Sequence, residues 1–285
     1  MNPAPFVIRM LVLDGDPDGV RMLDRSNWTG KAVVFPRSLI QRVRALPEYK
    51  KPGVYLLSGS PGEDGTTTLY IGEGDPVASR IDQHNTNKDF WTWAVFFTSS
   101  DATLNKVHIQ YLEAELVRLA KEAKRVNLDN GNTPQKPSLS AADEAEAGGF
   151  LTNMLGILPL LGIHAFEKVP VQEKHEIMLH LSAKGIKGTG YETSSGFVVC
   201  KGSTASKKTT PSIPSSITAK RKALLESGVI AEEGDALIFT QDTLFGSPST
   251  AAAVLKAGNA NGRLDWKDAK GRSLNDLAEQ ESQSE

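Results

Sequence analysis

Five residues whose side chains can do chemistry follow one another through the middle of the sequence: Tyr55, Tyr70, Arg80, His84 and Glu113. Tyrosine and histidine can transfer protons, arginine keeps a fixed positive charge, and a carboxylate can hold a cation. Taken singly, each has a commoner explanation, because arginine and glutamate on helices usually face solvent. Their occurrence together in this order favours a shared site.

The two tyrosines lie in mirrored triplets on a predicted hairpin. Residues 53–55 read Gly-Val-Tyr, residues 70–72 read Tyr-Ile-Gly, and a segment rich in Ser, Gly and acidic residues separates the two β-rich runs. A loop symmetric about residues 62 and 63 puts Tyr55 directly opposite Tyr70, with both phenols on one face. The glycines at the outer ends, Gly53 and Gly72, leave the backbone open to close approach. A plain hairpin also explains this pattern.

Two predicted helices carry the other three residues. Arg80 and His84 are four positions apart on a helix that we expect to begin with Asp75 as N-cap and the following proline as its first residue. That spacing places them on one helix face. Glu113 lies on a long amphipathic helix for which Asp101 is the predicted N-cap. The aromatic strand between the helices, residues 90–97, is interpreted as core.

The residues from 52 to 134 resemble the GIY-YIG endonuclease family. The two triplets match its paired motifs, with valine in place of isoleucine in the first, and Arg80, His84 and Glu113 follow at compatible spacing. The loop between the triplets is longer than usual. The family commonly ends this core with an asparagine, for which Asn127, Asn130 and Asn132 compete, and Asn130 is favoured. The resemblance implies that Gly53, Gly72 and Asn130 contact substrate.

The resemblance also implies hydrolysis of phosphodiester bonds with one divalent metal, Mg²⁺ or Mn²⁺, bound by Glu113. Magnesium retains several waters and accepts one carboxylate plus substrate phosphate. The rigid fork of Arg80 suits phosphate oxygens. Tyr55 is expected to activate the attacking water with help from His84, and Tyr70 to orient water or phosphate. The two tyrosines can exchange roles, and a covalent step at Tyr55 is the less favoured mechanism. The runner-up function is a non-catalytic nucleic-acid-binding or assembly module with the same fold.

Composition limits the partners and the location. The chain has 285 residues, of which 39% are apolar and 23% charged, and its net charge of −2 gives no sign of nucleic-acid binding as a whole. The one cysteine, Cys200, excludes an internal disulfide framework and a zinc site with several thiolates. Glycine and proline interrupt the uncharged run 147–166, which favours a buried helical hairpin over a membrane span. We expect a cytoplasmic protein that binds DNA, not a membrane, as a monomer or a homodimer.

The expected fold is α+β, with a small antiparallel sheet flanked by helices and a second small α+β domain at the C-terminus. The predicted division is a β-rich lead-in at 1–50, the nuclease-like domain at 51–135, a helical connector at 136–185, an accessory domain at 186–278 and a disordered tail at 279–285. Residues 191–277 resemble a domain of unknown function found at the C-terminus of bacterial GIY-YIG proteins. There Ser247 is expected to cap a helix. His108 is five positions before Glu113 and shares no helix face with it, so it is left out of the site.

Overall fold

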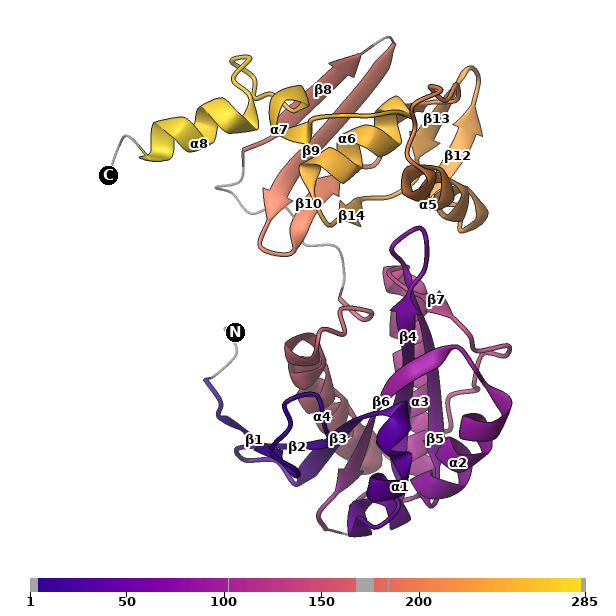
Figure 1. The fold of residues 1–285 in the computed structure, drawn as a ribbon. Helices are drawn as coiled ribbons and strands as arrows, with labels where there is room; N and C mark the ends of the chain where they lie inside the picture. The colour runs from indigo at the N-terminus through magenta and orange to yellow at the C-terminus, as the bar shows by residue number, and fades with distance from the viewer. Residues whose placement is uncertain (1–4, 102, 168–176, 184, 283–285) are drawn as a thin grey trace. The chain divides into compact units, whose positions relative to one another are not determined.

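The fold is that of a computed structural model, which describes residues 5–101, 103–167, 177–183 and 185–282 (Figure 1). The chain divides into two compact units. The first comprises Met1–Gly62 with Thr66–Glu167, and the second comprises Glu63–Gly65 with Lys168–Glu285. Both units combine helices with small, mainly antiparallel sheets, which confirms the predicted α+β class.

A seven-stranded sheet forms the framework of the first unit, in the order β1-β2-β3-β6-β4-β5-β7. Every neighbouring pair is antiparallel except β5 and β7, which run parallel. The strands are β1 (Ile8–Val12), β2 (Arg21–Arg25), β3 (Gly30–Pro36), β4 (Gly53–Pro61), β5 (Thr67–Gly74), β6 (Trp91–Ser99) and β7 (Asn127–Leu128). The strands of the expected lead-in, β1 to β3, therefore continue the sheet that carries both triplets.

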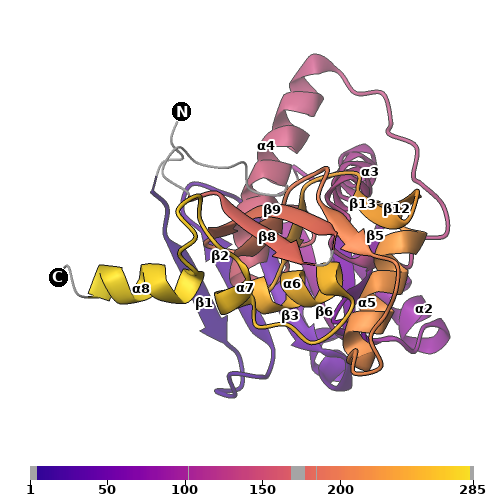
Figure 2. The ribbon, with the colours of Figure 1, turned by 90° about the horizontal axis from the view of Figure 1, so that it is seen from above.

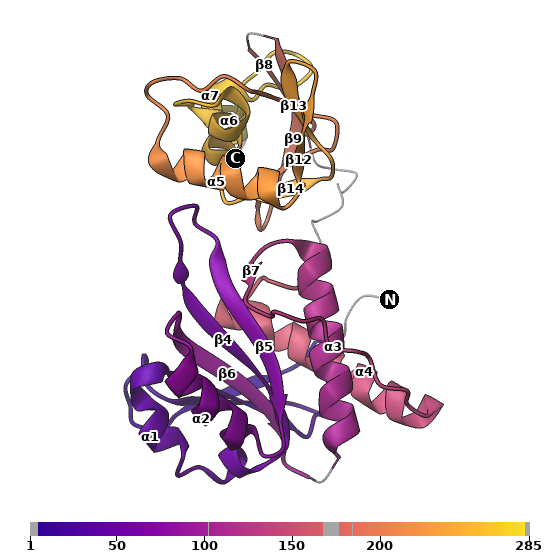
Figure 3. The ribbon, with the colours of Figure 1, turned by 90° about the vertical axis from the view of Figure 1, so that its right-hand side faces the viewer.

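Helices cover both faces of this sheet (Figure 3). On one face lie α1 (Ile40–Val43) and α2 (Val77–Asn87), together with short 3-10 turns at Arg37–Leu39 and Pro47–Lys50. On the other face lie α3 (Lys106–Ala123) and α4 (Ala141–Ile157), which a 3-10 turn at Leu158–Leu161 extends. Helix α4 was expected in a separate connector, but its apolar residues share the core of α3, so it belongs to the first unit.

The alternation of side chains along β4 builds two separate cores. Val54 and Leu56 point to the face of α3 and pack with Leu112, whereas Tyr55 and Leu57 point to the face of α2. All four of these strand residues are fully buried. The aromatic strand β6 is central and inserts side chains into both cores, which confirms its predicted role. A strand buried on both faces reads as a continuous apolar run.

The register of the β4–β5 hairpin differs from the expected one. Tyr55 pairs with Gly72, and Leu57 pairs with Tyr70, so the prediction that the two tyrosines lie directly opposite each other is wrong. The backbone N–H of Gly62 donates to the carbonyl of Thr66 across the loop, and the register shifts at a bulge between Ser58 and Pro61. The loop centre therefore lies farther along the chain than assumed, and the bulge moves the pairing again. A diagonal pair two positions off still shares a face.

Two predicted helix caps are also wrong. Helix α2 begins at Val77 with Pro76 as N-cap, and Asp75 makes no capping hydrogen bond. Helix α3 begins later than expected, and its N-cap is Asn105, whose side chain accepts from two backbone N–H groups of the first turn. Asp101 instead accepts from the Thr103 backbone N–H at 3.1 Å, before the helix. An aspartate or asparagine that precedes a helix can close a local turn as well as a cap.

The second unit contains a four-stranded sheet, β14-β10-β9-β8, and a three-stranded sheet, β11-β13-β12. Helix α6 packs on these strands and contributes a run of five buried residues to the core around Trp266. Ser247 is the N-cap of α6, as predicted. The elements are β8 (Leu179–Ala183), β9 (Ile186–Thr193), β10 (Gly196–Val199), β11 (Thr204–Ser206), α5 (Ser215–Glu226), β12 (Ile230–Glu233), β13 (Ala236–Phe239), β14 (Thr243–Phe245), α6 (Pro248–Lys256), α7 (Gly262–Asp265) and α8 (Leu274–Ser282).

Helix α8 projects away from the strands of its unit (Figures 1 and 2). It continues to Ser282, so the tail expected to be disordered from residue 279 is helical over its first residues, and residues 283–285 lie outside the described part. Among the described helices, none has the length and apolar character of a membrane span.

Candidate functional site

The hydroxyl of Tyr55 lies against the backbone of Gly72, its cross-strand partner. A Cβ at position 72 would stand 2.3 Å from the Tyr55 hydroxyl oxygen and 2.5 Å from Cζ. The mirrored triplets thus have a geometric explanation, because the tyrosine of the first occupies the space that a side chain in the second would fill. The Tyr55 side chain is fully buried, and its hydroxyl has no hydrogen-bond partner of ordinary geometry among the described residues.

Three rings meet on the face of the sheet that α2 covers. The ring centroids of Tyr55 and Tyr70 are 6.1 Å apart, and that of His84 lies 6.0 Å from the first and 4.6 Å from the second. The strands supply the two phenols, and α2 supplies the imidazole across them. Of the five residues that the sequence singled out, Tyr55, Tyr70 and His84 are therefore direct ring neighbours in the structure.

The imidazole of His84 is buried and uncharged. Its pKa is lowered to about 4, first by burial and then by the positive charges of Arg80 and Lys88, whereas Asp129 opposes this. Its Nε2 is buried without a hydrogen-bond partner among the described residues. A neutral ring with an unpaired nitrogen next to two phenols can accept a proton from either of them once a water or substrate connects the groups.

Arg80 lies one turn before His84 on α2, and its side chain is exposed. Its guanidinium donates to Gln83 Oε1 at 2.7 Å. Its charge nevertheless lowers the pKa values of Tyr55, His84 and Glu113 alike. One cation therefore acts on three candidate groups while keeping donors free for an incoming anion.

Glu113 reaches the same region from α3 and is half-buried. Burial raises the pKa of its carboxyl to about 7, and the neighbouring Glu73 raises it too, while Arg80 and Lys106 oppose this. Glu73 is itself paired with Lys106, at 2.6 Å and 2.7 Å for its two oxygens. The site thus contains two adjacent carboxylates, only one of which the sequence singled out.

Glu73 and Lys106 are residues that the sequence analysis missed. Glu73 directly follows the second triplet, and alternation along β5 turns it to the face of α3, away from the phenols. The outer edge of β5 is paired with β7 at Thr68 and Leu69 and with the Asn130 side chain at Ile71, so strand pairing with β7 ends before Gly72 and Glu73. The charge of Glu113 raises the pKa of Tyr55, although burial is the largest cause of that rise.

Asn130 and Gly53 have clear structural contacts. The Asn130 side chain accepts from the Ile71 N–H at 3.0 Å and donates to the Ile71 carbonyl at 2.7 Å, so it replaces a missing strand partner beside Tyr70. A Cβ at Gly53 would stand 2.4 Å from the Phe97 carbonyl oxygen. Both positions thus shape the strands that carry the tyrosines.

Lys88 is a further cation that the sequence did not single out. Its Nζ lies 4.5 Å from the centroid of the Tyr70 ring, and it pairs with the carboxylate of Asp129. Lys88 is also close enough to His84 for its charge to lower the pKa of the imidazole. A cation over a phenol ring stabilises that packing and adds positive charge near any bound anion.

The two adjacent carboxylates are donors of the type that Mg²⁺ and Mn²⁺ prefer. The Glu113 carboxyl, with a pKa of about 7, is protonated for part of the time at neutral pH, because burial and the neighbouring Glu73 disfavour its negative charge. A divalent cation would supply the missing compensation. Glu113 and Glu73 therefore fit a metal of this class.

The comparison with protein families matches the second unit. Residues 179–278 match the family described as "Domain of unknown function (DUF4357)", which confirms that the C-terminal part resembles a domain of unknown function. No match to the GIY-YIG family was found. No curated protein matches the chain, and no solved structure does.

Proposed function

We propose that the protein is a metal-dependent endonuclease that hydrolyses phosphodiester bonds in DNA. The observation that carries the proposal is the meeting of two phenols and a neutral imidazole as neighbouring rings, with a fixed cation and a carboxylate of raised pKa close enough to act on the pKa of Tyr55. Perturbed groups gathered from separate elements are typical of catalytic sites. The proposal extends the resemblance of residues 52–134 to the chemistry of this site.

The attacking water is activated through Tyr55 in this proposal. Burial raises the pKa of the Tyr55 hydroxyl above its ordinary value of 10, so the free phenolate is a poor resting state. His84 is a weak base at rest, because its pKa is lowered to about 4, but a phosphate bound beside the ring would raise that pKa and let it accept the proton as the water oxygen attacks phosphorus. Tyr70, which touches His84 edge-on, orients the water or the phosphate. Either tyrosine can fill either role by its chemistry.

Arg80 binds the phosphate in this proposal. Its guanidinium is exposed and charged at every relevant pH, and it can donate two parallel hydrogen bonds to the phosphate oxygens. The negative charge on those oxygens grows as the water attacks, so a fixed cation stabilises the transition state more than the ground state. Its present partner, Gln83, is neutral and costs little to release.

Glu113, with Glu73 beside it, would hold Mg²⁺ or Mn²⁺. When bound there, the metal would act as a Lewis acid that neutralises charge on the phosphate and the leaving oxygen. Glu113 must lose its proton to act as a ligand, so metal affinity rises with pH toward about 7. Lys106 pairs with Glu73 in the absence of metal.

Duplex DNA is the proposed substrate, and cytoplasm the proposed location. A homodimer would cut both strands, whereas a monomer would nick one. Both arrangements are compatible with a single site per chain. The second unit is proposed to guide DNA or to bind another protein.

The experiment is a cleavage panel with the full chain in Mg²⁺ or Mn²⁺. Substrates are supercoiled plasmid, linear duplex, single-stranded DNA and RNA, and the variants are Glu113→Gln and the matched control Glu122→Gln. Glu122 lies on the same helix but pairs only with Arg118, away from the site. We expect metal-dependent cleavage that Glu113→Gln abolishes and Glu122→Gln retains. Binding of DNA without any cleavage would refute the enzyme and leave the non-catalytic module.

A further inference from the structure

The strongest unexplained feature outside the proposed active site is the imidazole of His108 at the start of α3. The residue is 4% exposed, and its Nδ1 lies 2.8 Å from the carbonyl oxygen of Thr103. A carbonyl only accepts hydrogen bonds, so Nδ1 carries the proton. In the neutral ring, Nε2 then has a free lone pair.

That lone pair has no hydrogen-bond partner among the described residues, although Nε2 is buried. The nearest charged atom is Oδ1 of Asp143 on α4, at 3.5 Å. At this distance a proton on Nε2 would make an ion pair with Asp143, with a long hydrogen bond. A lone pair that faces a carboxylate is unfavourable unless a proton or a metal cation lies between them, and a second carboxylate nearby favours the cation with the larger charge.

A second carboxylate completes the group. Glu146 follows Asp143 by one helical turn on α4, and one ligand atom from each of His108, Asp143 and Glu146 lies within 4.8 Å of the others. Residues three apart share a helix face, so both carboxylates are presented to the histidine. The group joins the first turns of two helices that pack on each other.

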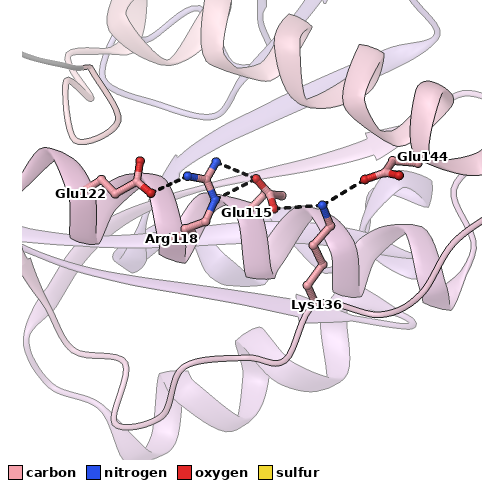
Figure 4. A network of polar contacts seen from close by, with 5 residues as sticks. All are labelled: Glu115, Arg118, Glu122, Lys136 and Glu144. Carbon is pink, nitrogen blue, oxygen red and sulfur yellow. Dashed lines mark hydrogen bonds and ion pairs between the residues drawn. The ribbon is translucent and has the colours of Figure 1, made fainter. Parts of the chain in front are cut away.

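The surrounding contacts hold α4 at this position. The Ser140 side chain accepts from the backbone N–H of Asp143 as the N-cap of α4. Lys136 bridges Glu115 on α3 to Glu144 on α4, at 3.4 Å and 3.0 Å (Figure 4). These contacts fix the position of α4, and with it the carboxylates of Asp143 and Glu146, before any cation binds.

We propose that His108, Asp143 and Glu146 bind a divalent transition-metal cation of the zinc type that fastens α3 to α4. One imidazole nitrogen and two carboxylate oxygens are a ligand set suited to zinc, with a water in the fourth position. The hydrogen bond from Nδ1 to a backbone carbonyl is the usual means of fixing a metal-binding histidine in its tautomer. Magnesium would not favour the imidazole.

This site is independent of the proposed nuclease centre. His108 and Glu113 are five positions apart on α3, which turns them about 140° away from each other around the helix axis. The zinc-type site therefore stabilises the helical layer, and its metal does not touch the phosphate. Either site can exist without the other.

The test is Zn²⁺ binding to the full chain after treatment with a chelator, followed by calorimetry and by the shift in unfolding temperature. Glu146→Gln removes one ligand at an exposed position, and Glu122→Gln is the matched control with the same charge change near the far end of α3, where its carboxylate pairs with Arg118. We expect the Zn²⁺ Kd to rise at least about tenfold in Glu146→Gln, since even the loss of a partner behind a ligand costs about 10–100-fold. The control should bind as the wild type does.

Two further measurements separate this site from the proposed nuclease. Glu113→Gln should retain wild-type Zn²⁺ binding and the rise in unfolding temperature, whatever the outcome of the cleavage panel. X-ray absorption of the zinc-loaded protein should show nitrogen and oxygen ligands at about 2.0–2.2 Å with the outer-shell scattering of one imidazole. Unchanged Zn²⁺ affinity in Glu146→Gln, loss of binding in Glu113→Gln, or absorption without an imidazole would each overturn the proposal.

Discussion

Replacement of Gly72 by alanine tests the geometry on which the candidate site depends. The added Cβ would stand 2.3 Å from the Tyr55 hydroxyl oxygen, whereas heavy atoms in contact are normally about 3.5–4.0 Å apart. The hydroxyl must therefore move by roughly 1 Å or more. Tyr55 is fully buried and flanked by the rings of Tyr70 and His84, so it has no free space to enter.

We expect Gly72→Ala to lower the free energy of unfolding by about 1–3 kcal/mol, the usual cost of overpacking a core. Any cleavage activity should fall about 100-fold, because a 1 Å displacement of a catalytic group has an effect of that size. Urea denaturation measures the first quantity, and the initial rate of plasmid cleavage measures the second. The matched control is Gly149→Ala, where the new Cβ meets no atom within 4 Å on exposed α4.

In Gly149→Ala, the free energy of unfolding should rise by about 0.5–1 kcal/mol because alanine has a higher helix propensity than glycine. If Gly72→Ala proves as stable as the wild type, or gains stability as the control does, the contact between Tyr55 and Gly72 is not as described. The explanation of the mirrored triplets would then be refuted as well.

Three other predictions follow from the same side chains. Tyr55→Phe should raise the free energy of unfolding by about 1 kcal/mol in urea denaturation, because it removes a buried hydroxyl that has no hydrogen bond of ordinary geometry; a loss of stability would show that its contact with Tyr70 is a hydrogen bond. Because the pKa of His84 is lowered in the folded state, the free energy of unfolding should fall as pH drops from about 6.5 to 4. Because the pKa of Glu113 is raised, the free energy of unfolding should fall as pH rises from about 4.5 to 7. Each group changes the free energy of unfolding by at most about 1.4 kcal/mol per pH unit. Glu113→Gln should therefore leave a stability that increases with pH over this range, and His84→Asn one that decreases; equal slopes in both variants would contradict the assigned shifts. Asn130→Ala should lower the free energy of unfolding by about 1–3 kcal/mol, because it leaves the backbone N–H and carbonyl of Ile71 without their partner. Unchanged hydrogen exchange of the Ile71 amide would refute this prediction.

The fold class and most elements could be predicted from the sequence because their signals are local. Alternating apolar residues and a polar loop marked β4 and β5, and the helical repeat marked α3. The cap of α6 at Ser247 was also readable, since a serine before a proline and an apolar run is a strong N-terminal signal. The sequence did not predict that β1–β3 pair with the central sheet, because pairing between strands far apart in the sequence leaves no local pattern.

The register of the hairpin shows why finer detail was missed. A bulge near Ser58 and a loop centred beyond Gly62 moved the pairing by two positions, and neither has a distinct signal in this sequence. The order of the five candidate residues was visible in the chain, but Glu73 was not, because its position beside Glu113 depends on how α3 crosses the edge of β5. Likewise, His108 gained significance only once α4 was found to bring two carboxylates to it.

The central claim is that Tyr55 takes part in phosphodiester cleavage, and a single-turnover rate measures this most directly. Supercoiled plasmid is mixed with excess enzyme and Mg²⁺ or Mn²⁺, and wild type is compared with Tyr55→Phe and the control Glu122→Gln. We expect Tyr55→Phe to be at least about 100-fold slower, although it is no less stable, and the control to match the wild type. Equal rates in wild type and Tyr55→Phe would contradict the account.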